Sequence, residues 1–148
     1  MGKNKPIIIK ADCIKKEEYG ETPCRIIVDG SATQGLFSIV EQNLKKGKIS
    51  DNHLHTLEGH SVDILSGFVL VSLEGHLYEL KAGDFIYIPP YVWHEFKVLE
   101  DETRIRITNY PAGFENIFEE LQTNPVNKHS KISAKYGILV TDNSVFKK

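Results

Sequence analysis

Residues 47–60 read GKISDNHLHTLEGH, and residues 83–94 read GDFIYIPPYVWH. Side chains two residues apart on a strand point to the same face, so His53 and His55 would direct both imidazoles into one space. His94 begins a separate strand beyond a proline-rich turn. Because an antiparallel barrel places such stretches side by side, the sequence predicts that these histidines gather at one site.

The two stretches belong to a longer pattern, over residues 25–109, of short apolar runs broken by Gly, Pro and Asp about every ten residues. This pattern is typical of an all-β antiparallel sandwich or barrel. The expected strands are 25–28, 36–40, 62–65, 67–73, 76–80, 84–88, 94–98 and 104–108. Glu74-Gly75, between two extended runs, predicts a tight hairpin.

After Pro111 the apolar period lengthens to that of a helix. The apolar positions at this spacing are Phe114, Ile117, Phe118 and Leu121. A short helix should therefore lie on the barrel, followed by a second one with Ser130 as its cap and Gly137 as its end. We expect a single domain over residues 1–148, with a barrel core at about 25–110 and a helical tail at about 111–141.

The composition excludes several classes of function. The 148 residues, 41% of them hydrophobic, suit one core of ordinary size. The 18 Lys and Arg nearly balance the 20 Asp and Glu, so no strong positive field favours nucleic acid or an anionic membrane as a partner. The longest apolar run, Phe68 to Val71, is far shorter than a membrane-spanning helix requires.

The chain shows no signal peptide, and Cys13 and Cys24 form no dense disulfide framework, so we expect a cytoplasmic protein. The apolar segment 7–9 could pair with a sheet edge of a second copy, so a homodimer is possible. His76 and His129 lie in polar or turn segments, and we expect both to be exposed.

The spacing of the first stretch resembles the first motif of the cupin superfamily. Its anchors coincide with Gly47, His53, His55, position 60 and Gly67. This resemblance implies a cupin barrel, a double-stranded β-helix or jelly roll, that holds a metal ion.

The second stretch resembles the second cupin motif, with anchors at Gly83, Pro89 and His94. The tail, residues 110–121 with 132–141, is similar to that of the quercetin-dioxygenase-like single-domain cupins. The resemblance covers residues 36–141, and the first 35 residues match less clearly.

Three positions depart from the family's pattern. His60 stands where the first motif offers a glutamate ligand, Tyr91 replaces the usual glycine, and Val98 replaces the usual asparagine. With His53, His55 and His94, the resemblance thus implies a four-histidine site. Such a site suits one divalent transition metal, namely Zn, Fe, Ni, Cu, Co or Mn, better than Mg or Ca.

Glu58 is the competing carboxylate. Only two residues separate it from His55, short of the family's spacing, so it ranks behind His60 as a ligand. It remains a candidate base or ligand partner at the site. Tyr91, Trp93 and Phe96 flank His94 and are candidate substrate-pocket residues, with plain barrel packing as an equal alternative.

The resemblance implies a metal-dependent enzyme that acts on a small aromatic or enolisable organic molecule, with dioxygenase-like chemistry. In the dioxygenases, the glutamate replaced here by His60 is implicated in accepting the substrate's proton, which argues against flavonol oxygenation itself. Two alternatives stay open. One is a non-oxidative isomerase, lyase or cyclase, and the other is a non-catalytic module that binds a small molecule or metal.

Overall fold

The computed structural model describes residues 5–13, 17–19 and 22–147, and antiparallel strands dominate it. The strands are β1 (Glu17–Tyr19), β2 (Thr22–Val28), β3 (Ser38–Leu44), β4 (Asn52–His55), β5 (Gly59–Ser66), β6 (Phe68–Leu73), β7 (His76–Lys81), β8 (Phe85–Ile88), β9 (His94–Val98), β10 (Thr103–Tyr110) and β11 (Ile138–Thr141). The helices are η1 (Ala11–Cys13), η2 (Phe114–Asn116), α1 (Ile117–Thr123), η3 (Val126–Lys128) and α2 (His129–Lys135).

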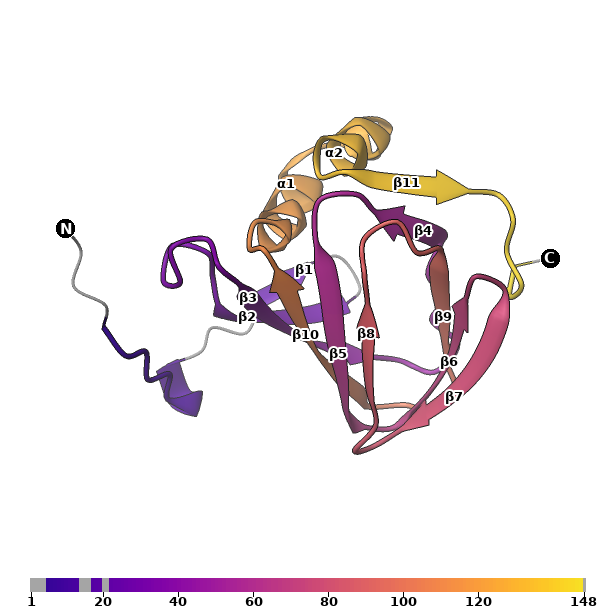
Figure 1. Ribbon diagram of the computed structural model, residues 1–148, viewed down its shortest axis with the longest axis horizontal. Coiled ribbons are helices and arrows are strands. Elements are labelled where there is room, and N and C mark those ends of the chain that lie inside the picture. The colour runs from indigo at the N-terminus through magenta and orange to yellow at the C-terminus, as the bar shows by residue number, and fades with distance from the viewer. Residues whose placement is uncertain (1–4, 14–16, 20–21, 148) are drawn as a thin grey trace.

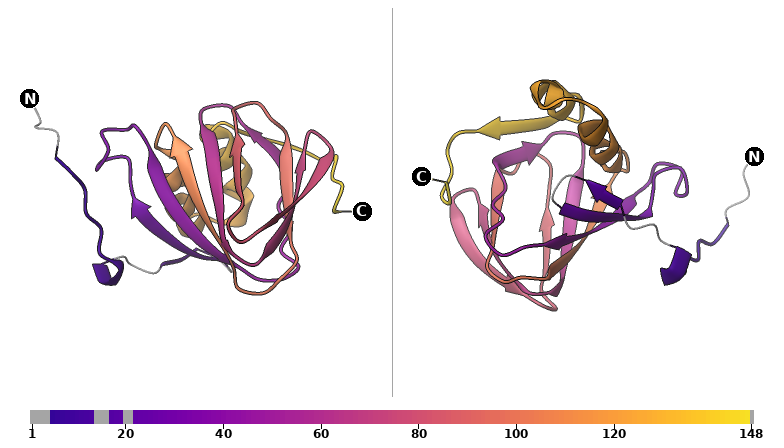
Figure 2. Two further views of the ribbon diagram at one scale, coloured as in Figure 1. Left: turned by 60° about the horizontal axis from the view of Figure 1, so that its bottom comes forward. Right: turned by 180° about the vertical axis from the view of Figure 1, so that it is seen from behind.

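Two antiparallel sheets face each other and enclose the interior (Figures 1 and 2). One sheet has the strand order β1-β2-β3-β10-β5-β8, and the other has the order β11-β4-β9-β6-β7. Because many sheet neighbours are distant in sequence, the chain crosses repeatedly from one sheet to the other, as in a jelly roll. The all-β barrel predicted from the alternating apolar runs is confirmed.

The buried apolar side chains line the inside of the barrel and leave part of it hollow. The cluster consists of Leu44, Ile64, Val69, Val71, Val98 and Ile105. These side chains come from both sheets, and all but Val98 also line the cavity described below. The hydrophobic core and the cavity wall are therefore largely the same surface.

Glycines permit the tight turns that connect the strands. The predicted Glu74–Gly75 hairpin joins β6 to β7, with φ of 49° and 83° at its two residues. Two successive positive φ values match the twist of the paired strands. At the start of β6, Gly67 has φ of 88°, and a Cβ there would lie 2.1 Å from the Thr103 hydroxyl. Only glycine fits this position.

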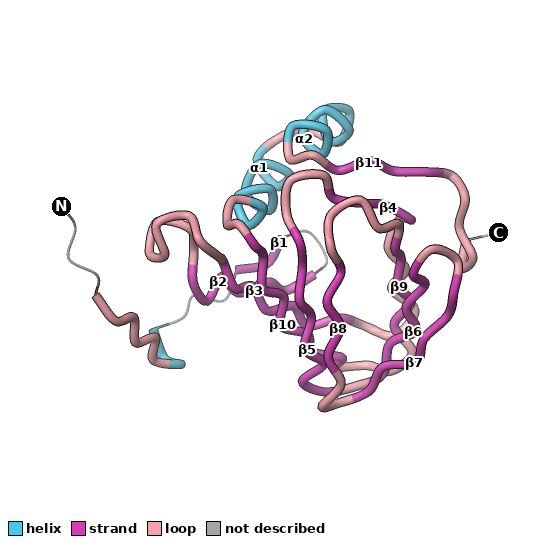
Figure 3. The backbone as a smooth tube through the Cα atoms, viewed as in Figure 1, coloured by secondary structure: helices cyan, strands magenta, loops and turns pink. Residues whose placement is uncertain are grey.

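The helical tail lies at one end of the barrel, and β11 extends the second sheet beside β4 (Figure 3). The helix predicted from the 3.6-residue period is confirmed, although its first turn, η2, is a 3-10 helix. The prediction that Ser130 caps the second helix was wrong. That helix begins at His129, because η3 leads directly into it, and no side-chain hydrogen bond caps it.

Glu115 ties this tail to the barrel. Its carboxylate is buried and accepts hydrogen bonds from the backbone N–H groups of Gly30, at 2.8 Å, and Gly113, at 2.7 Å. The two oxygens thereby join the loop after β2 to the first turn of the tail. A buried carboxylate with both oxygens satisfied in this way fixes the angle at which η2 leaves β10.

Other expectations concern the periphery. Residues 5–13 lie apart from the barrel, and Ile8 in the apolar segment is 79% exposed (Figure 1). His76 is exposed as predicted. The prediction for His129 was wrong: its side chain is half-buried, and its Nε2 donates a hydrogen bond to the Asn124 carbonyl at 3.0 Å. No helix in the described part of the chain is long and apolar enough to cross a membrane.

Candidate metal centre

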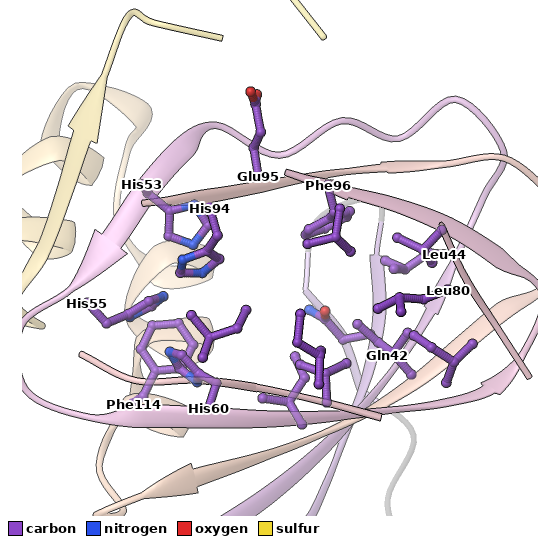
Figure 4. A pocket seen from close by; sticks show the side chains of 18 of the residues that line it. Gln42, Leu44, His53, His55, His60, Leu80, His94, Glu95, Phe96 and Phe114 are labelled. Carbon is purple, nitrogen blue, oxygen red and sulfur yellow. The ribbon is translucent and has the colours of Figure 1, made fainter. Parts of the chain in front are cut away.

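The four motif histidines gather at one end of the barrel interior (Figure 4). His53 and His55 lie two residues apart on β4 and share one face of it. His94 on β9 lies directly opposite His53, and the centroids of these two rings are 4.3 Å apart. His60, at the start of β5, packs against His55 at 4.0 Å and lies 6.4 Å from His94. His55 therefore lies between the other members of the cluster.

The backbone orients two of these imidazoles. Nδ1 of His53 is 2.7 Å from the carbonyl oxygen of Asp51, and Nδ1 of His94 is 2.8 Å from that of Val92. A carbonyl oxygen only accepts hydrogen bonds, so each Nδ1 must carry the proton. The lone pair on each Nε2 is therefore available to a ligand.

A buried asparagine orients the third imidazole. Nδ1 of His60 donates to the side-chain oxygen of Asn109 at 2.6 Å, and the Asn109 amide donates to the Ser38 hydroxyl at 2.9 Å. All of these groups are buried. Nε2 of His60 is left buried without a hydrogen-bond partner in the described structure. An unsatisfied buried nitrogen of this kind is costly unless something binds it.

Glu58 enters the same cluster. One carboxylate oxygen, Oε1, lies 2.8 Å from Nδ1 of His55 and 3.6 Å from Nε2 of His60. Despite the 2.8 Å separation, neither Oε1 of Glu58 nor Nδ1 of His55 makes a hydrogen bond of acceptable geometry. Three unsatisfied polar atoms, one from each residue, thus converge in a buried space.

The potential ligand atoms form two overlapping groups, each with all its atoms within 4.8 Å of one another. The first group is His53, His55 and His94, and the second is His55, Glu58 and His60. His60 therefore approaches the cluster on the same side as the carboxylate, and His55 belongs to both groups.

Burial determines the charge of these groups. Burial is the main reason that the pKa values of His55, His60 and His94 fall to about 3, and repulsion between the imidazoles is the second reason. Burial also lowers the pKa of His53 and raises the pKa of Glu58. Near neutral pH the imidazoles are uncharged and able to bind a cation, and the carboxylate is more basic than usual.

A cavity of about 230 Å³ adjoins the histidines inside the barrel. Its wall is mainly aliphatic, and Phe114 and Phe118 from the helical tail complete it. The Phe114 ring meets His55 and His60 edge to face, with centroid distances of 4.9 Å and 5.4 Å. The tail therefore forms part of the site as well as the outside of the barrel.

The three candidate pocket residues lie in different places. Phe96 lines the cavity. Tyr91 is 66% exposed, on the turn before β9, where its backbone N–H donates to the His55 carbonyl at 2.9 Å. Trp93 lines a separate polar depression beside residues 141–145. Only one of the three side chains thus faces the space beside the histidines.

The C-terminal segment holds the strands that carry the histidines. β11 pairs with the whole of β4, with Val140 opposite His53. Glu95 on β9 points away from the cavity (Figure 4) and accepts hydrogen bonds from the Ser144 hydroxyl at 2.7 Å and the Val145 N–H at 2.6 Å. The C-terminal segment therefore contacts both β4 and β9 on the side away from the cavity.

Sequence reasoning missed three residues of the site. Phe114 belonged to a regular helical stripe, which indicated core packing. Asn109 is directly opposite His60 in the register between β10 and β5, and Gln42 occupies an inward position on β3 between two buried apolar residues. Gln42 could have been noticed in the sequence, because it is a polar residue in a row of inward-facing apolar positions. Asn109 could not, because its contact with His60 depends on how β10 pairs with β5.

The chain is similar in sequence to proteins of the cupin family. Residues 40–109 match the Cupin_2 family model, described as a cupin domain. Quercetin 2,3-dioxygenase of Bacillus subtilis (strain 168) is 25% identical over 100 residues, 68% of this chain and 30% of that protein. The match therefore spans less than a third of the relative's length.

Two solved structures share the fold. KdgF from Halomonas sp. superposes with a TM-score of 0.66 at 17% identity, covering 74% of this chain and 99% of that one. An RmlC-like cupin from Shewanella frigidimarina NCIMB 400 gives a TM-score of 0.64 at 19% identity, covering 76% and 96%. At these identities the likeness concerns the fold alone.

Proposed function

Residues 40–109 are a cupin domain, and on that premise we propose that this chain is a metal-dependent enzyme acting on a small aromatic or enolisable organic molecule, with dioxygenase-like chemistry. One observation carries the proposal. Three unsatisfied polar atoms of His55, Glu58 and His60 converge in a buried space beside an apolar cavity. Burying these three atoms without partners lowers the stability of the fold, so their convergence indicates that they bind something.

The donor set fits a divalent transition metal. We propose that His53, His55, His60 and His94 hold one such ion, of Zn, Fe, Ni, Cu, Co or Mn. Neutral imidazoles suit these borderline metals, and the fixed Nδ1–H groups raise the basicity of the nitrogens that would bind. Glu58 competes with His60 for this role, because its oxygen reaches the same side of the cluster.

When bound, such a metal would polarise substrate oxygens and, if redox-active, would let dioxygen react at the same site. Glu58 lies beside the cavity lining, and we propose that its Oε1, which makes no hydrogen bond, takes a proton from the substrate. Burial raises the pKa of this carboxyl group and so makes it a stronger base than usual. Phe114 and the aliphatic wall would exclude water from the reacting groups.

The position of Glu58 also supports a second candidate, a non-oxidative isomerase, lyase or cyclase. A buried base beside two imidazoles can move a proton between substrate atoms without an oxidant. This candidate uses the same metal as a Lewis acid only.

Metal content and oxygen uptake separate these possibilities. Protein as purified would be analysed for metals by mass spectrometry and then supplied with flavonols and 1,3-diketones in an oxygen-electrode cell. Dioxygenase-like chemistry predicts a redox-active metal and uptake that depends on the substrate. Redox-inactive zinc with no uptake would refute it, and tight binding of a small molecule without turnover would favour a binding module.

Two substitutions test the ligand assignment. His60→Gln is expected to weaken metal binding at least tenfold, by removing a nitrogen whose orientation is fixed. Glu58→Gln should retain the metal and lower turnover, because it removes only the proposed base. His76→Gln, at an exposed position on the β6–β7 hairpin, is the control and should change neither. Unchanged metal content in His60→Gln with metal loss in Glu58→Gln would reverse the two roles.

A further inference from the structure

Among the described residues, one further polar side chain is directed into the cavity beside the histidines. Nineteen of these residues line the cavity, and apart from the four histidines the polar ones among them are Gln42 and Glu95. The carboxylate of Glu95 points away from the cavity toward the C-terminal segment, whereas Gln42 lies among aliphatic side chains on the side of Leu44 and Leu80 (Figure 4). No Lys or Arg of residues 5–13, 17–19 or 22–147 lines the cavity.

The strand pairing fixes the position of Gln42. Along β3, Val40 and Leu44 are 1% and 2% exposed, and Gln42 lies between them on the same face, opposite Ile105 of β10. We find no hydrogen bond from its amide to any described residue of the chain. The side chain is half-buried and lines the cavity, so its amide is open to a molecule inside it. A polar residue in this otherwise apolar row adds nothing to core packing, and a ligand is the partner that it can reach.

These features limit the chemistry of an occupant. A multiply charged anion would find no cationic side chain among the described residues of the cavity wall. A polyhydroxylated molecule would leave most of its hydroxyl groups without partners against aliphatic walls. The cavity, at about 230 Å³, is also smaller than the roughly 300–1,000 Å³ typical of sites for drug-sized ligands.

We propose that the cavity takes a small, mainly apolar molecule of about one ring, whose distal hydroxyl or carbonyl group hydrogen-bonds to the Gln42 amide. The opposite end of the molecule carries the oxygens that meet the histidine cluster. This inference rests on the proposed function, because a metal held by the histidines would bind that end. It selects among the molecules that a metal-dependent cupin of this kind could accept.

Calorimetric titration of the purified, metal-loaded protein tests the proposal. The probes are benzohydroxamic acid, its 3-hydroxy and 4-hydroxy derivatives, and a three-ring flavonol. Each hydroxamate has one ring and a metal-binding head, and the derivatives add one distal hydroxyl. We expect at least one derivative to bind about five- to tenfold more tightly than the parent, because its distal hydroxyl gains one hydrogen bond to the Gln42 amide. The flavonol should bind more weakly than any hydroxamate.

Gln42→Leu assigns the effect to the amide. This variant should lose the preference for the hydroxylated derivative, bind the parent probe at least as well as the original protein, and keep its metal content. Asn43→Leu, at the exposed neighbouring position, should preserve the preference. Gln42→Glu keeps the shape of the side chain and one acceptor, so it should retain part of the preference.

The outcomes distinguish this inference from the proposed function. A protein that binds no metal refutes the proposed function and, with it, the inference. A metal-bearing protein that binds parent and hydroxylated probes equally, before and after Gln42→Leu, overturns the role of Gln42 alone. Flavonol binding as tight as that of the one-ring probes overturns the size limit, and no probe binding to metal-bearing protein overturns the ligand class.

Discussion

A single hydrogen bond to Nδ1 orients three of the four imidazoles, those of His53, His60 and His94. Backbone carbonyls orient His53 and His94, and a substitution cannot remove them. His60 depends instead on a side chain, Asn109, which is fully buried and also binds Ser38. Of these three histidines, His60 is therefore the one whose hydrogen-bond partner a single substitution can remove.

Replacing Asn109 should thus weaken metal binding at a distance from the metal. Asn109→Ala is expected to raise the metal dissociation constant by about 10- to 100-fold and to lower the free energy of unfolding by about 1–3 kcal/mol. Competition with a chelating dye measures the first quantity, and urea denaturation measures the second.

Two further variants control this prediction. Asn109→Asp keeps an acceptor for Nδ1 of His60 and should recover most of the metal affinity. Asn43→Ala, at an exposed position on β3, should change neither quantity. If Asn109→Ala were destabilised but bound metal normally, its hydrogen bond would be structural only.

At the scale of elements, the alternating apolar runs predicted eight strands of the barrel, and the short strands β1 and β11 were not among them. The alternating runs and the Glu74–Gly75 turn predicted strands and a hairpin that the structure contains. The pairing of β10 with β5, which brings Asn109 to His60, is not a local property. Sequence spacing therefore predicted the motif histidines, whereas their supporting contacts followed only from the sheet register.

Gly67 shows how one turn constrains two strands. It has φ of 88°, and a Cβ would collide with Thr103, so Gly67→Ala combines backbone strain with overpacking. We expect a loss of about 2–4 kcal/mol in the free energy of unfolding. Gly83 is the matched control, because its φ is 94° but a Cβ would meet nothing within 4 Å.

Gly83→Ala should therefore lose only about 1 kcal/mol, from its positive φ alone. Urea denaturation of both variants gives the comparison. Equal losses would show that the contact with Thr103 relaxes without penalty, and that backbone conformation alone selects glycine at position 67.

At the scale of the whole molecule, a hollow core makes stability depend on what is bound. Most side chains of the core cluster also face the cavity, His55 and His60 line it, and Oε1 of Glu58 lies close to both imidazoles. Metal that binds the folded chain but not the unfolded one stabilises it by mass action.

Chelation should accordingly lower the unfolding temperature. With free metal at about 1,000 times its dissociation constant, removal should reduce the free energy of unfolding by about 4 kcal/mol. Thermal melts with and without EDTA measure this difference. A His53→Gln/His55→Gln double variant should show almost no response, and an undiminished response there would mean that the chelator acts elsewhere.

The pairing of β11 with β4 also has a consequence for biosynthesis. His53 leaves the ribosome more than eighty residues before its strand partner Val140. At elongation rates of roughly 5–20 residues per second, the nascent chain carries an unfinished sheet edge for several seconds. During that interval the histidine strand lacks its outer neighbour. Metal capture by the growing polypeptide should therefore be weak until translation has passed β11.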